Sequence, residues 1–149
     1  MSYQTLQEEA QRLHSQAEVL ETEAEEAHLQ DVKQKGLNGW LNYNFESSSG
    51  LTPEFALFSK QVKAALGKLM VGYEMIDYSR GHFEFSAFFK NITTNKLVYV
   101  SCSDVRSWPN GWFNNLLIRT ATGPKDYTGG SNNYATLPGL KSAADRLTA

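Results

Sequence analysis

The sequence predicts an α+β protein, with a long N-terminal heptad helix followed by a mainly antiparallel four- to five-stranded sheet that has helices packed on one face. Three observations predict it. Apolar residues recur with a period of seven over the first 27 positions. Short alternating segments separated by polar turns follow one another between residues 71 and 120. An amphipathic stretch lies just ahead of them and can cover one side of a sheet.

Residues 2–35 carry the most regular pattern in the chain. Apolar side chains occupy the a and d positions of four heptads and form one narrow seam along a helix. They are Tyr3, Leu6, Ala10, Leu13, Ala17, Leu20, Ala24 and Ala27. Ser2 suits the start of this helix, and Gly36 suits the position just past its end. Two interpretations stay open: the seam self-associates or binds a partner helix, or it packs on the chain's own core.

The remaining elements follow from alternation and turn chemistry. Thr52 and Pro53 favour the start of a helix that reaches about residue 69. We expect strands at 37–45, 71–78, 83–91, 96–103 and 112–120, an irregular segment at 121–137, and a short helix from 138 to about 148. Short turns favour antiparallel hairpins. The expected domains are a helix over 1–35 and a single α+β domain over 36–149.

Composition limits the class of protein. Cys102 is the one cysteine, which excludes an intrachain disulfide and a cysteine zinc site and favours a reducing compartment. No apolar run is long enough to span a membrane, and the first residues do not resemble a secretory signal. We therefore expect a cytoplasmic protein with no membrane partner.

Charge is distributed unevenly. Residues 1–35 hold eight acidic and three basic side chains, and residues 36–149 hold eight acidic and eleven basic ones, so that the second segment has a net charge of +3. This charge permits contact with a nucleic-acid backbone but is far below that of a dedicated nucleic-acid binder.

Motifs that indicate catalysis are absent from the sequence. It has no phosphate-binding loop, dinucleotide fingerprint, zinc-protease motif, calcium loop or nucleophile elbow. Asp77 and Glu84 on neighbouring expected strands could hold Mg²⁺, with Lys90 beside them as in many nucleases. A polar outer face with cross-strand ion pairs is the favoured interpretation. A pair of Cys102 with His82 is conceivable, although a free cysteine is usually a small core residue. We assign no catalytic residue, cofactor or metal site.

The C-terminal third is the most unusual segment. Tryptophan and arginine gather in one turn between 106 and 112, and a long polar loop with glycine and aromatic residues spans 122–134. Long loops in compact domains are often functional, and tryptophan and arginine dominate interface hot spots. The candidate partner-binding residues are Arg106, Trp108, Trp112, Arg119, Lys125, Asp126, Tyr127, Asn132 and Asn133. The alternative is that the tryptophans anchor the loop on the sheet.

Together these observations favour a non-enzymatic interaction or assembly module. It would self-associate as a homo-oligomer, or bind a partner helix, through the N-terminal seam, and would contact a second partner through the C-terminal loops. One alternative is an accessory protein that binds single-stranded nucleic acid, because aromatic rings stack on bases while arginine and lysine meet phosphates. The other is a small metal-dependent phosphodiesterase that uses Asp77 and Glu84.

Overall fold

The computed structural model describes residues 2–43, 45, 53–107, 109–126 and 130–149. It confirms the predicted α+β class, with an N-terminal helix followed by a five-stranded antiparallel sheet and further helices. The chain divides into two compact units, Met1–Trp40 and Leu41–Ala149. The expected helix start at Thr52 lies outside the described residues. Among the helices that the structure describes, none is long and apolar enough to cross a membrane.

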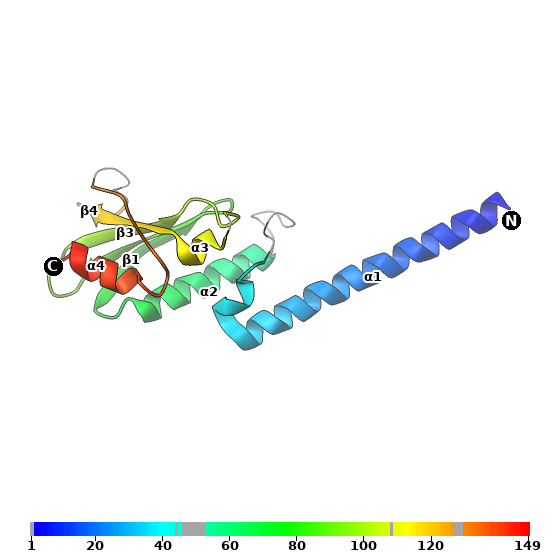
Figure 1. Ribbon diagram of the computed structural model, residues 1–149, viewed down its shortest axis with the longest axis horizontal. Helices are drawn as coiled ribbons and strands as arrows, with labels where there is room; N and C mark the ends of the chain where they lie inside the picture. The colour runs from blue at the N-terminus through cyan, green and yellow to red at the C-terminus, as the bar shows by residue number, and fades with distance from the viewer. Residues whose placement is uncertain (1, 44, 46–52, 108, 127–129) are drawn as a thin grey trace. The chain divides into compact units, whose positions relative to one another are not determined.

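The first unit consists of one long helix and a short 3-10 turn. α1 runs over Tyr3–Lys35, and η1 follows over Gly36–Trp40 (Figure 1). The hydroxyl of Ser2 accepts a hydrogen bond from the N–H of Thr5 at 3.2 Å, which satisfies one free donor of the first turn. Gly36 has φ of +65°, a left-handed conformation that ends the helix without a Cβ clash.

The expected strand at 37–45 is wrong. The 3-10 turn η1 occupies its first part, and Leu41 and Asn42 form a turn. Asn42 has φ of +64°, which no strand residue adopts, and its N–H donates to Oδ1 of Asn110 at 2.8 Å. Phe45 is buried. The alternation of apolar residues here therefore reflects side chains that anchor a loop, rather than the pleat of a strand.

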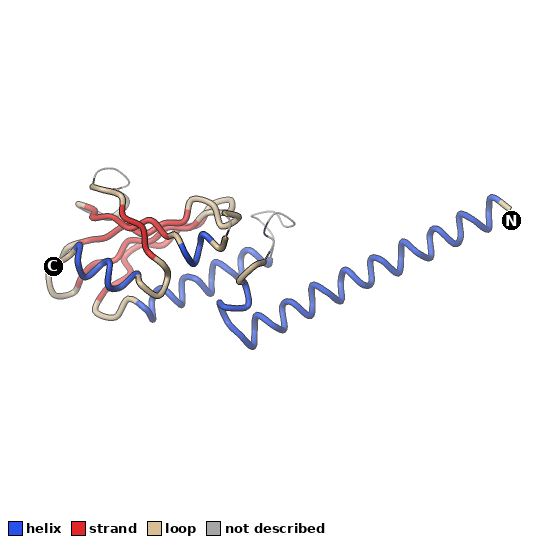
Figure 2. The backbone as a smooth tube through the Cα atoms, viewed as in Figure 1, coloured by secondary structure: helices blue, strands red, loops and turns tan. Residues whose placement is uncertain are grey.

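The second unit contains the sheet, whose strands are red in Figure 2. The strands follow chain order and are all antiparallel to their neighbours. Its elements are α2 (Pro53–Leu69), β1 (Tyr73–Arg80), β2 (Phe85–Asn91), β3 (Leu97–Cys102), α3 (Gly111–Asn114), β4 (Leu116–Ala121), β5 (Asn133–Ala135) and α4 (Leu140–Leu147).

The core lies between the inner face of this sheet and its helices. Figure 1 shows α2 and α4 on the same side of the sheet. The ring of Phe58 on α2 lies 5.1 Å from the ring of Trp112 on α3 and 6.4 Å from that of Phe85 on β2. The hydroxyls of Tyr78 on β1 and Ser59 on α2 lie 2.7 Å apart. Aromatic packing thus joins α2, α3 and the sheet, and a part-buried hydrogen bond links α2 to the edge strand β1.

Other strand boundaries also differ from the sequence-based expectation, and β1 runs over Tyr73–Arg80 rather than 71–78. The expected strand at 112–120 begins only at Leu116, because Trp112 lies in the helical turn α3 and points into the core. Asn110 adopts φ of +50° and redirects the chain there. The expected strand at 83–91 begins at Phe85, since Phe83 has φ of +63° and belongs to the turn. The expected irregular segment at 121–137 contains the short strand β5.

Candidate functional site

The outer face of the sheet carries a row of side chains that crosses four strands. Strand register places Asp77, Phe88, Tyr99 and Arg119 side by side. The ring of Tyr99 lies 4.9 Å from that of Phe88, and the guanidinium carbon of Arg119 lies 4.8 Å from the centre of the Tyr99 ring. Nε of Arg119 is buried and has no hydrogen-bond partner among the described residues. An aromatic ring with a cation over it is therefore held on a face that α2, α3 and α4 do not cover.

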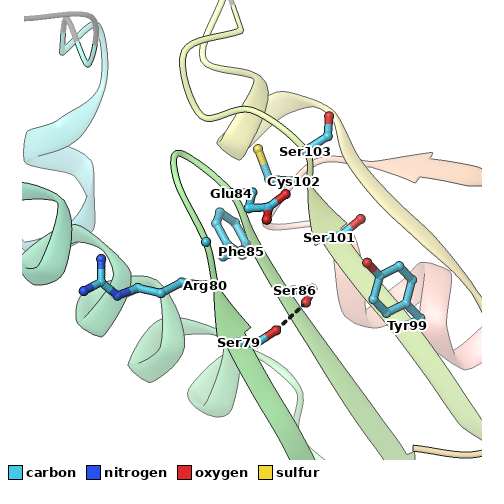
Figure 3. Close-up of a pocket in the computed structure, with 10 residues that line it drawn as sticks. Ser79, Arg80, Glu84, Phe85, Ser86, Tyr99, Ser101, Cys102 and Ser103 are labelled. Atoms are coloured by element: carbon cyan, nitrogen blue, oxygen red, sulfur yellow. Dashed lines mark hydrogen bonds between the residues drawn. The ribbon is translucent and has the colours of Figure 1, made fainter. Parts of the chain in front are cut away.

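A second row, mostly of hydroxyl groups, runs beside the first. Register places Ser79, Ser86, Ser101, Leu117 and Tyr134 next to one another across all five strands. The hydroxyl oxygens of Ser79 and Ser86 lie 3.0 Å apart, as the dashed line in Figure 3 shows. These side chains share a face because register partners on antiparallel strands point to the same side of a sheet.

A pocket of about 380 Å³ opens over this serine row. Its lining combines hydroxyl groups with the carboxylate of Glu84 and the ring of Tyr99 (Figure 3). The lining residues are Ser79, Arg80, Gly81, Glu84, Phe85, Ser86, Tyr99, Ser101, Cys102 and Ser103. Hydroxyl groups both donate and accept hydrogen bonds, so this surface suits a polar ligand or a polar segment of a partner.

The lining shows no activated nucleophile. A serine or cysteine nucleophile requires a nearby base or a lowered pKa. Burial raises the pKa of Cys102 to about 12, so its thiol stays protonated at neutral pH. His82, the conceivable partner of Cys102, is not among the lining residues, and its ring lies 4.4 Å from that of Phe83.

The state of Cys102 gives a direct prediction. In the folded protein at pH 8, the thiol should react with a disulfide reagent far more slowly than a free cysteine, because it is buried and carries a raised pKa. Addition of urea through the unfolding transition should restore rapid reaction. Fast reaction of the folded protein, with native circular dichroism preserved, would contradict this placement.

The carboxylates of the phosphodiesterase alternative do not form a cluster. Asp77 lies in β1 opposite Phe88, whereas Glu84 lies in the turn ahead of β2 and not in a strand. Lys90 lies farther along β2, opposite Glu74. Among the described residues, no group of three or more histidine, cysteine, aspartate or glutamate side chains is placed to hold a metal ion.

The residues expected at a loop interface lie in different places. Arg106 bonds to Asp104 at 2.9 Å, and its guanidinium carbon lies 4.4 Å from the centre of the Phe83 ring. This arginine lowers the pKa of Asp104 through its hydrogen bonds. Trp112 is 1% exposed and belongs to the core. Trp108 and Tyr127 lie outside the described residues.

Polar groups of the second loop form hydrogen bonds with residues close to them in sequence. Oδ2 of Asp126 accepts hydrogen bonds from the N–H and the hydroxyl of Thr122 at 3.1 and 2.8 Å. Nδ2 of Asn133 donates to the carbonyl of Ser131 at 3.0 Å. Lys125 and Asn132 are exposed. Of the expected interface residues that the structure describes, only Arg119 joins the aromatic row. Phe88 and Tyr99 were missed because their proximity depends on strand register.

The seam of α1 is a second candidate surface. Its large side chains are strongly exposed: Tyr3 is 77%, Leu6 51%, Leu13 55% and Leu20 65% exposed. The alanines at positions 10, 17 and 27 are also exposed, and for position 24 only the backbone is described. Among the described residues of the unit Met1–Trp40, α1 is the only α-helix, so no second α-helix of this unit covers the seam.

No family model, no curated protein and no solved structure matches this chain.

Proposed function

We propose that this protein is a non-enzymatic assembly module that associates, with itself or with a partner helix, through the seam of α1. One observation carries the proposal: four large apolar side chains and the alanines between them lie along one face of a 33-residue helix and are exposed. A single buried cysteine is typical of a reducing compartment, which supports a cytoplasmic location.

The physical reason is the weak stability of isolated helices. In water most of the stability of a helix comes from burial of its apolar face against another element, rather than from helix propensity. Full burial of one leucine side chain contributes roughly 1.5–3 kcal/mol. Leu6, Leu13 and Leu20 are more than half exposed, so a partner helix could bury much of this area. We infer that a second helix supplies that burial.

Sedimentation equilibrium of the full chain tests the proposal. If α1 self-associates, the weight-average mass should rise from that of one chain, 16.7 kDa, toward a multiple of it as the protein concentration increases. Helix content measured by circular dichroism should fall on dilution together with the mass. A mass of one chain at all concentrations, with unchanged helix content, would exclude self-association.

A second candidate function is the binding of single-stranded nucleic acid on the outer face of the sheet. Two observations favour this candidate. Arg119 lies beside the ring of Tyr99, and the buried Nε of Arg119 has no hydrogen-bond partner among the described residues. Aromatic rings stack on bases and arginine meets phosphates, and the ring of Tyr99 is partly exposed. The net charge of +3 over residues 36–149 is compatible with weak, salt-dependent binding.

Anisotropy of labelled single- and double-stranded oligonucleotides at two salt concentrations tests this candidate. Arg119→Gln should weaken binding. It should also reduce, by about one, the slope of the logarithm of the binding constant against the logarithm of the salt concentration. The matched control, Lys68→Gln, removes an equal charge from the exposed side of α2 and should change little. Absence of binding by the unmodified protein at low salt, or equal effects of the two substitutions, would remove the candidate.

A further inference from the structure

We propose that α1 pairs with the α1 of a second copy of this chain in an antiparallel arrangement, with residue n of one helix opposite residue 30 − n of the other. This inference rests on the proposed function and adds the partner, the orientation and the register. It follows from the sizes of the side chains along the seam and from the distribution of charge along the helix.

The sizes of the seam side chains are complementary in this register. Tyr3 lies opposite Ala27 of the second copy, Leu13 opposite Ala17, and Leu20 opposite Ala10. Leu6 lies opposite position 24, which is also alanine. Each layer of the interface therefore pairs one large residue with one small residue. Each such pair fills about the same distance between the two helix axes. Two straight helices can therefore pack along the whole seam without gaps.

Other arrangements lose this complementarity. In a parallel, in-register pair each residue faces itself, so two leucines meet at position 13 and two alanines at position 10. Wide and narrow layers would alternate, and contact at the leucines would leave gaps at the alanines, which lose dispersion contacts. An antiparallel pair shifted by one heptad, with residue n opposite residue 23 − n, places Tyr3 against Leu20.

Charge along α1 favours the same orientation. Residues 16–30 hold five glutamates and no lysine or arginine, a net charge of −5, whereas residues 1–15 hold two glutamates and one arginine, a net charge of −1. A parallel pair sets the two strongly acidic halves side by side, where like charges repel. The antiparallel pair sets each strongly acidic half against a nearly neutral one. It also opposes the two helix dipoles.

The antiparallel orientation determines where the ends of the two paired helices lie. The 25 residues from Tyr3 to Ala27 form a paired rod of about 38 Å at 1.5 Å per residue. The two Lys35 ends of α1 lie at opposite ends of this rod.

Oxidative cross-linking of full-length cysteine variants tests the orientation. The natural Cys102 is buried and gives a low background. The variants are Ala10→Cys, Leu20→Cys and the double variant Ala10→Cys/Leu20→Cys, with Ser15→Cys on the outer side of the helix as the control for random collision. In the antiparallel register only position 10 meets position 20, at a spacing that a disulfide can bridge.

The expected result is loss of the monomer band in the double variant alone, with both single variants at the level of the Ser15→Cys control. Cross-linking of Ala10→Cys by itself would overturn the antiparallel orientation while leaving self-association intact. A monomeric mass of the unmodified chain, together with no cross-link in any variant, would overturn the proposed self-association and the orientation with it.

Discussion

Replacing Trp112 by alanine should lower the free energy of unfolding by roughly 3–5 kcal/mol, the range for truncation of a buried large aromatic residue. Trp112 is 1% exposed, and its ring lies 5.1 Å from that of Phe58 and 5.7 Å from that of Phe113. Its removal leaves a cavity at the junction of α2, α3 and the sheet. Urea unfolding followed by far-UV circular dichroism measures the loss.

Tyr134→Ala is the matched control for this substitution. Tyr134 is also aromatic and lies on the same unit, but it is 60% exposed at the outer face. Its truncation should change the free energy of unfolding by no more than about 0.5 kcal/mol. A wild-type unfolding midpoint for Trp112→Ala would mean that this tryptophan is not a core residue and would return it to the list of candidate contact residues.

Replacing both Leu13 and Leu20 by glutamine should abolish self-association at concentrations where the unmodified chain associates. A dimer contains four of these leucine side chains, two from each copy. Each replacement removes part of the roughly 1.5–3 kcal/mol that full burial of a leucine side chain contributes. A loss of only about 2 kcal/mol for the four side chains together already weakens the dissociation constant about 30-fold. Sedimentation equilibrium at matched concentrations measures the change.

Val19→Gln is the control that distinguishes a specific effect of the seam from the loss of any exposed apolar side chain. Val19 is 56% exposed, nearly the same as Leu13, but it lies outside the a and d positions. This variant should associate like the unmodified chain. Equal losses in Val19→Gln and in the double seam variant would show that a different face of α1 is used.

The elements that sequence predicts well are those with a long, regular pattern. The four heptads of α1 and the Pro53 start of α2 depend on local spacing and on terminal residues, and the structure places both helices there. The expected strand at 37–45 is wrong because three alternating apolar residues are too few to separate a pleat from a loop with anchored side chains. The left-handed conformation of Asn42 depends on its bond to Asn110, which is 68 residues away in the chain.

The candidate site shows the same division. Arg119 was predicted as a contact residue because arginine is common at interfaces. Its position beside Tyr99 depends on the pairing of β3 with β4, which the sequence does not show. The serine row needs the register of all the strands that it crosses, which no spacing within one strand reveals. Conversely, tryptophan at position 112 suggested an interface because the sequence does not show that α3 turns its ring toward Phe58.

The central claim is that a second helix covers the seam of α1, and the alkylation rates of two introduced thiols test it most directly. Ala17→Cys lies on the seam and Val19→Cys on another face, and both positions are exposed in the single chain. At concentrations where the protein associates, position 17 should react several-fold more slowly than position 19, and dilution should make the two rates equal. Equal rates at every concentration would contradict the claim.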